Sequence, residues 1–215
     1  MRTLFHDRVD AGRRLASTLR ASDLGDAVVV GLARGGVPVA AEVARQLSLP
    51  LDALGVRKVG HPWQPEYALG AVAPGGGEAL IRSHDDLGDA ELRRAIEQAK
   101  VQADALHRSL HEHRPPAEIQ GRTVLLVDDG LATGATMVAA VRWARGRGAA
   151  RVVVAVPVGA AASLRFLHLE ADEVVCPYEL EDFGAVGLWY DAFPQVEDAQ
   201  VAAILDELGA PAPAA

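Results

Sequence analysis

The sequence predicts an α/β fold in which a mostly parallel central sheet is flanked by helices. Its apolar runs are short and built mainly from Val, Leu and Ala, and segments with helical spacing of apolar residues alternate with them. Strands that are buried on both faces have such uniform runs, and alternating helices cover a parallel sheet. The length of 215 residues suits one domain.

The predicted elements follow one another without a linker that would separate two domains. Uniform apolar runs predict strands at 27–32, 51–59, 123–127, 151–156 and 173–176. Apolar residues at helical spacing predict helices at 9–19, 38–47, 89–113, 134–147, 161–169 and 197–208. The segments 69–73 and 78–82 flank a Pro-Gly-Gly-Gly turn and are expected to pair as a hairpin.

Composition narrows the classes of partner. A net charge of -8 argues against a general nucleic-acid or anionic-membrane surface, although it permits a local basic pocket. The single cysteine, Cys176, excludes an internal disulfide framework, fits a reducing cytosol and is expected to be a buried strand residue. The N-terminus lacks the apolar core of a signal peptide, and no apolar run approaches the roughly 20 residues that span a bilayer. We therefore expect a cytoplasmic protein that binds small molecules and neither nucleic acid nor membrane.

The strand at 123–127 runs into a segment with unusual chemistry, Asp-Asp-Gly-Leu-Ala-Thr-Gly-Ala-Thr. Thr133, Gly134 and Thr136 lie where a helix begins, so free amides and two hydroxyls there would hold a phosphate. Asp128 and Asp129 would repel a phosphate but accept hydrogen bonds from hydroxyls. A helix cap explains one Thr or one Asp, but not this whole pattern. A phosphate beside a pair of hydroxyls describes a ribose 5-phosphate.

Two further strand ends carry groups that suit anions. Gly35 and Gly36 follow Arg34 after the strand at 27–32, where the alternative is an ordinary strand–helix turn. Arg57 and Lys58 lie near the end of the second strand, where the alternative is a solvated basic pair. Two cations at such a place suit a pyrophosphate.

The segment 124–136 resembles the motif by which type I phosphoribosyltransferases bind 5-phospho-α-ribosyl 1-diphosphate (PRPP). The resemblance implies that Asp128 and Asp129 bind the ribose hydroxyls. It implies that the segment from Ala132 to Thr136 binds the 5-phosphate. The substrate-binding residues would then be Asp128, Asp129, Gly130, Leu131, Ala132, Thr133, Gly134, Ala135 and Thr136.

The same resemblance extends to the other two strand ends. The loop Ala33, Arg34, Gly35 and Gly36 is similar to the family's pyrophosphate loop, which commonly has a non-proline cis peptide, here between Ala33 and Arg34. The family also places a basic residue near the pyrophosphate, so the resemblance implies Lys58, with Arg57 second. The segment 59–82, whose first part is too irregular to predict as an element, resembles the family's mobile loop.

The resemblance implies a hood built from about 1–20 and 177–208. Phe183 or Trp189 would stack on a flat acceptor in this hood, or would instead pin the C-terminal helix to the core. Ala132 stands where some 6-oxopurine enzymes have an acidic residue, so a hypoxanthine or guanine acceptor is less expected.

The activity implied is Mg²⁺-dependent transfer of phosphoribosyl from PRPP to a nitrogen acceptor, expected to be a nucleobase, with release of pyrophosphate. Lys58, Asp128 and Asp129 would be the catalytic residues. Mg²⁺ would be held mostly by ligand and water, without direct side-chain ligands, and Asp128 and Asp129 would reach it only through water. A homodimer is expected. The alternative is a regulator that binds PRPP or a nucleotide without turnover, and a weaker one is a hydrolase or phosphorylase.

Overall fold

A computed structural model describes residues 3–80 and 87–209. At its centre lies a five-stranded sheet in the order β2-β1-β6-β7-β9, with every neighbouring pair parallel. The strands are β1 (Val28–Ala33), β2 (Leu51–Gly55), β6 (Thr123–Val127), β7 (Arg151–Ala155) and β9 (Glu173–Val175). The predicted α/β fold with a parallel central sheet is confirmed.

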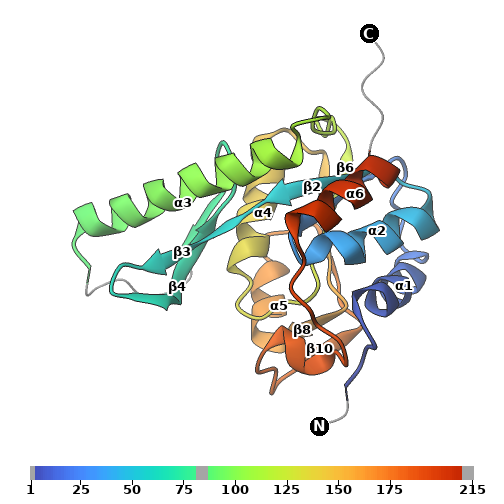
Figure 1. Ribbon diagram of the computed structural model, residues 1–215. Helices are drawn as coiled ribbons and strands as arrows, with labels where there is room; N and C mark the ends of the chain where they lie inside the picture. The colour runs from blue at the N-terminus through green and yellow to red at the C-terminus, as the bar shows by residue number, and fades with distance from the viewer. Residues whose placement is uncertain (1–2, 81–86, 210–215) are drawn as a thin grey trace.

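Helices cover both faces of this sheet (Figure 1). Leu125 and Val127 pack in one apolar cluster with α1 (Arg8–Leu19), α2 (Gly36–Leu47) and α6 (Asp198–Leu208). Val124 and Leu126 pack in another with α4 (Ala135–Gly146) and α5 (Ala161–Leu167). Successive side chains of a strand point to opposite faces, so β6 is buried by helices on both sides.

A second, antiparallel sheet projects from the first. It consists of β3 (Arg57–His61), β4 (Gln64–Val72) and β5 (Glu78–Leu80). The long helix α3 (Asp89–Leu110) lies along it in Figure 1, and Val59, Leu69 and Val72 pack against Ile96 and Ala99. The predicted pairing of 69–73 with 78–82 is confirmed for the described residues, and 81–82 lie outside them.

Two predictions in this region are wrong. The single strand expected at 51–59 is two strands, because the chain leaves the central sheet after Gly55. There α3 comes so close that a Cβ on Gly55 would lie 2.9 Å from the backbone nitrogen of His107. The first part of 59–82, expected to be irregular, is also regular, since β3 and β4 form a hairpin that turns between His61 and Gln64. Turn-forming residues at its tip hid the strands from pattern analysis.

The N-terminal segment and the segment around β10 meet beside the C-terminal edge of the central sheet. Short strands β8 (Val158–Ala160) and β10 (Tyr178–Leu180) pair in parallel, and a 3₁₀ helix (Val186–Trp189) follows. Phe5 forms a bridge with Tyr190 and shares an apolar cluster with Val158 and the aromatic rings after β10. These strands are too short to have been predicted from periodicity. The segments expected to form a hood are thus in contact, and their role as a hood stays a prediction.

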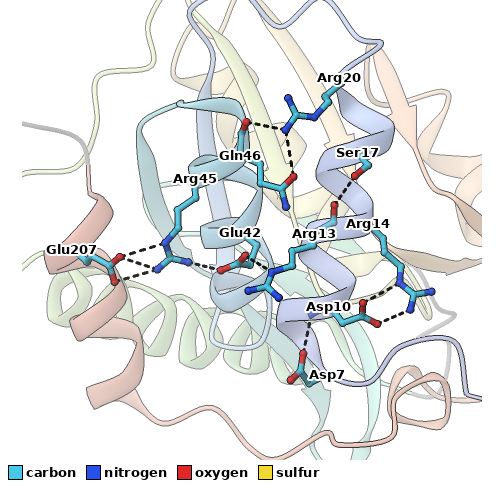
Figure 2. Close-up of polar contacts among 10 residues, drawn as sticks. All are labelled: Asp7, Asp10, Arg13, Arg14, Ser17, Arg20, Glu42, Arg45, Gln46 and Glu207. Atoms are coloured by element: carbon cyan, nitrogen blue, oxygen red, sulfur yellow. Dashed lines mark hydrogen bonds and ion pairs between the residues drawn. The ribbon is translucent and has the colours of Figure 1, made fainter.

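Helix α1 is held against α2 and α6 by a network of charges (Figure 2). Glu42 is 8% exposed and accepts a hydrogen bond of 3.1 Å from the Nε atom of Arg13 and another from Arg45. Arg45 also pairs with Glu207 of α6, at 3.1 Å. Gly12 lets the two helices approach, because a Cβ there would lie 2.7 Å from that of Glu42. The orientation of α1 is therefore fixed by close packing and by buried charge.

A buried histidine ties the end of α3 to the start of β2. The Nε2 atom of His111 lies 2.8 Å from Asp52, and Nδ1 lies 2.7 Å from the carbonyl oxygen of His107. Both partners only accept hydrogen bonds, so the ring holds two protons and a positive charge. Burial opposes that charge, but the hydrogen bond and charge of Asp52 outweigh burial and raise the pKa of His111. Burial lowers the pKa of the neighbouring His107 to about 4, so that ring is neutral.

We predict that His111 makes the protein less stable at alkaline pH. Its pKa is higher in the folded state than the roughly 6.5 of an unfolded histidine, so its contribution is complete below that pH and is lost as pH rises through the folded pKa. The lowered pKa of His107 affects stability only at pH values below roughly 6.5, outside this window. The free energy of unfolding, measured with urea from mildly acidic to mildly alkaline pH, should fall in this window, and His111→Gln should flatten the fall.

His168→Gln is the matched control, because His168 is exposed. It should keep the wild-type pH dependence. An unchanged pH dependence in His111→Gln would contradict the charged pair.

Candidate functional site

The loops that follow β1 and β6 meet at the C-terminal edge of the central sheet. A Cβ on Gly36 would lie 2.6 Å from the carbonyl oxygen of Val127 and 2.8 Å from the Cα of Asp128, and a Cβ on Gly35 would collide with the carboxylate of Asp129. Only glycine permits so close an approach. Two loops predicted separately from the sequence are thus parts of one site, and the predicted cis peptide between Ala33 and Arg34 is present.

Asp129 is held from two directions. Its side chain is buried, and Oδ2 accepts a hydrogen bond of 2.8 Å from the Nε atom of Arg8, at the start of α1. Its carbonyl oxygen accepts a hydrogen bond of 2.5 Å from the hydroxyl of Tyr190. Arg8 itself donates to the carbonyl oxygen of Pro194 at 2.7 Å and lies 3.7 Å from the centre of the Phe193 ring. The N-terminal helix and the segment after β10 therefore both fix this residue.

The two carboxyl groups disfavour each other's charge. Burial, and then the charge of Asp129, raises the pKa of Asp128 well above its usual range, while Arg8 and Lys58 act in the opposite direction. Burial also raises the pKa of Asp129, against the charge and hydrogen bond of Arg8. Carboxyl oxygens can accept hydrogen bonds from hydroxyls, so the pair suits hydroxyls rather than anions.

The segment that follows Asp129 leads into an open helix end. Gly134 adopts a left-handed conformation with φ of 79° and is the N-cap of α4, so no capping side chain covers the first amides of that helix. The first helical hydrogen bond runs from the Val138 amide to Gly134 at 2.9 Å. Ser163 of α5 supports the loop by donating to the carbonyl oxygen of Ala132 at 2.6 Å. Exposed amides at a helix N-terminus attract phosphate.

Other residues of the predicted motif have packing roles. Leu131 is buried and exchanges backbone hydrogen bonds with β8, from its amide to Val158 at 2.9 Å and from the Ala160 amide at 2.8 Å. Gly130 lies against Val186, where a Cβ would approach a methyl group to 2.6 Å. These residues shape the loop, while Thr136 and the two aspartates face the cavity beside it.

A cavity of about 410 Å³ lies where these loops converge. Its volume is in the usual range for small-molecule sites, roughly 300–1,000 Å³. The sequence-predicted residues that line it are Ala33, Arg34, Gly35, Arg57, Asp128, Asp129 and Thr136. The residues that sequence reasoning missed are Arg8, Leu32, Val56, Val186, Phe193, Gln195 and Val196.

Residues 4–186 match the family model described as "Phosphoribosyl transferase domain". The chain belongs to this family. The resemblance to type I phosphoribosyltransferases that the motif carries is thereby confirmed.

Two Mycobacterium tuberculosis proteins, from the strains CDC 1551 and H37Rv, are both named "Putative phosphoribosyl transferase" and are each 44% identical to this chain over 210 residues. The match covers 94% of this chain but only 46% of each relative, so the chain spans about half the length of these curated relatives. The crystal structure of TT1426 from Thermus thermophilus is 44% identical, with a TM-score of 0.81, and the match covers 98% of this chain and 100% of that one.

The two basic residues of β3 separate in this phosphoribosyl transferase domain. Arg57 lines the 410 Å³ cavity, whereas Lys58 is exposed and lines a larger cavity, of about 630 Å³, between β3 and α3. Lys58 still influences Asp128 through its charge. The chemistry of the motif lies at the smaller cavity, so we take that one as the candidate site. The catalytic role of Lys58 stays a prediction.

The aromatic residues expected over the acceptor are buried within the segments after β10. The Nε1 atom of Trp189 donates to the carbonyl oxygen of Phe183 at 3.0 Å, and the ring centroids lie 6.2 Å apart. Neither ring lines the cavity, and both pack with Phe5 rather than with α6. Their stacking on an acceptor stays a prediction that this burial does not favour. Phe193 is the aromatic side chain that lines the cavity.

No group of three or more His, Cys, Asp or Glu side chains is arranged to hold a metal ion within residues 3–80 and 87–209. Over the same residues, no helix is long and apolar enough to cross a membrane. The thiol of Cys176 is partly buried, and burial raises its pKa to about 12.

We predict that Gly36→Ala destabilises the protein by about 1–3 kcal/mol, since the methyl group would press on the backbone of the loop that carries Asp128. Gly146→Ala is the matched control, because a Cβ there meets no atom within 4 Å. It should leave stability unchanged or raise it slightly. Urea unfolding of both variants tests this, and equal stabilities would contradict the close contact between the loops.

Proposed function

We propose that the protein is a Mg²⁺-dependent phosphoribosyltransferase that moves the phosphoribosyl group of PRPP to a nitrogen acceptor and releases pyrophosphate. One observation carries the proposal. Asp128, Asp129 and Thr136 of the first turn of α4 face one cavity, whose other wall is the loop of Arg34 and Gly35, and the glycine N-cap leaves the start of α4 without a capping side chain. Membership of the phosphoribosyl transferase domain family supports the same reading.

The chain offers a place for each part of the donor. Hydroxyls of the ribose would donate to Asp128 and Asp129, and the 5-phosphate would bind the amides and hydroxyls between Thr133 and Thr136. Arg34 and Arg57 line the same cavity, where their charges would stabilise the pyrophosphate. Lys58 would join them if the β3–β4 hairpin moves, in keeping with the mobile loop expected at 59–82.

Catalysis in this proposal depends on orientation and charge rather than on a protein nucleophile. Pyrophosphate leaves with the electrons of its bond to C1, the ribosyl carbon becomes cationic, and the acceptor nitrogen supplies the new bond. The pair of carboxylates fixes the sugar ring throughout. Closure of the hairpin would exclude water from the reactive carbon.

The described residues fit a metal that arrives with the substrate. Bound Mg²⁺ would neutralise the pyrophosphate oxygens. Asp128 and Asp129 are hard oxygen donors that would reach such an ion through water.

The acceptor is proposed to be a nucleobase, with Phe193 and Val186 as apolar walls of its place in the cavity. Ala132 carries no acidic group, so a hypoxanthine or guanine acceptor is not favoured. We further propose a cytoplasmic homodimer whose other partners are small molecules rather than nucleic acid or membrane.

We predict that Asp129→Asn lowers kcat/KM for PRPP by roughly 10–100-fold, because hydrogen bonds to a charged group contribute about 1.5–3 kcal/mol. The measurement is pyrophosphate release with PRPP, Mg²⁺ and a panel of bases and amines. Asp26→Asn is the control, since the Asp26 side chain is 82% exposed. Full turnover and PRPP affinity in Asp129→Asn would contradict the assignment, and PRPP binding without pyrophosphate release for any acceptor would favour the regulator.

A further inference from the structure

Arg8 is a buried arginine beside the cavity that the proposed chemistry does not yet use. It is the first residue of α1 and only 9% exposed. Its guanidinium reaches Asp129 with Nε, the carbonyl oxygen of Pro194 with Nη1 and the face of Phe193. These three contacts fix the orientation of the guanidinium, because its donors lie in one rigid plane.

Helix α1 is itself anchored by residues that do not line the cavity. Figure 2 shows Arg13 of α1 directed at Glu42 of α2, which Arg45 joins to Glu207 of α6. Asp7 caps the helix by accepting from the Asp10 amide at 2.8 Å. Although Arg8 lies near the N-terminus, its position is therefore fixed by the contacts of α1 with α2.

Asp129 needs such a partner if it is to accept hydrogen bonds from a sugar. It is buried, it adjoins a second carboxyl group, and a lone carboxylate in such a place would take up a proton. Protonation would turn an acceptor into a donor. Arg8 contacts Oδ2, and the contacts found in residues 3–80 and 87–209 place no other side chain on Oδ1.

We propose that Arg8 is a positioning residue of the ribose subsite, acting through Asp129. Its guanidinium occupies one carboxylate oxygen and fixes the orientation of the group, and the other oxygen is left to receive a ribose hydroxyl. The N-terminal helix is thereby part of the active site. This inference rests on the proposed function, since it concerns how the same site binds the sugar of PRPP.

The test compares two partial ligands in the full-length protein. Ribose 5-phosphate has the sugar hydroxyls and inorganic pyrophosphate lacks them, so the loss of Arg8 should affect the binding of the first ligand only. In Arg8→Gln the Kd of ribose 5-phosphate should rise at least about tenfold, in line with the loss of one partner of a buried charge pair. The Kd of pyrophosphate with Mg²⁺ should not change. Calorimetric titration measures both, and thermal unfolding verifies that the variant is folded.

Two further variants separate positioning from folding. Arg13→Gln is the matched control on the same helix, because Arg13 also pairs with a buried carboxylate but its side chain is 64% exposed. Because Arg13 does not line the cavity, this variant should bind both ligands as the wild type does. Arg8→Lys keeps the charge without the fork that reaches both acceptors, so the Kd of ribose 5-phosphate should lie between those of the wild type and Arg8→Gln. It serves as the test if Arg8→Gln does not fold.

A double-mutant cycle tests whether Arg8 acts through Asp129. In the Asp129→Asn background, Arg8→Gln should not raise the Kd of ribose 5-phosphate further. Three results would overturn this inference but leave the proposed function standing. They are wild-type affinity for ribose 5-phosphate in a folded Arg8→Gln protein, equally weakened binding of both ligands, and an additive effect in the double mutant. A wild-type protein that binds neither PRPP nor ribose 5-phosphate would overturn the proposed function and this inference with it.

Discussion

Two adjacent carboxyl groups, Asp128 and Asp129, have to lie together at the edge of a buried sheet, and much of the structure around them serves to make that arrangement stable. Burial raises the pKa of both groups, and the charge of Asp129 raises the pKa of Asp128 further. The opposing contribution comes from Arg8, which reaches them from the other end of the chain. The contact of Phe5 with Tyr190 and the hydrogen bond from Tyr190 to Asp129 bring the N-terminal segment and the segment after β10 to this one point.

The parallel sheet explains why the parts of the site converge. The carboxyl ends of β1 and β6 are neighbours, so the loops that follow them must share space. Gly35 and Gly36 remove the side chains that would keep these loops apart. The chain then leaves the central sheet after β2 and forms the antiparallel hairpin, which places Arg57 at the candidate site and Lys58 at the larger cavity between β3 and α3. In the proposed function, the groups for the sugar and the 5-phosphate come from the loop after β6, and those for the pyrophosphate come from the loop after β1 and from β3.

Much of this arrangement was predictable from sequence, and the failures have physical causes. The central strands and the two aspartates carry strong local signals, because burial on both faces and a Thr-Gly-X-Thr helix start leave distinct patterns. The sequence predicted β2 and β3 as one strand because apolar residues continue across Gly55. The contact of Gly55 with α3, which separates the two strands, is long-range and leaves no local pattern. Arg8 was missed although a signal existed. It occupies the same helix face as the buried residues Ala11 and Leu15, where an arginine is costly without a partner. Phe193 lies in an irregular segment whose place only tertiary contacts define.

The central claim is that the site after β6 binds the phosphoribosyl end of PRPP. The most direct measurement is a crystal structure of the protein with ribose 5-phosphate. The account predicts the phosphate on the amides between Thr133 and Thr136, with the ribose hydroxyls on Asp128 and Asp129. A ligand found instead in the cavity between β3 and α3, or bound with its phosphate away from the start of α4, would contradict it.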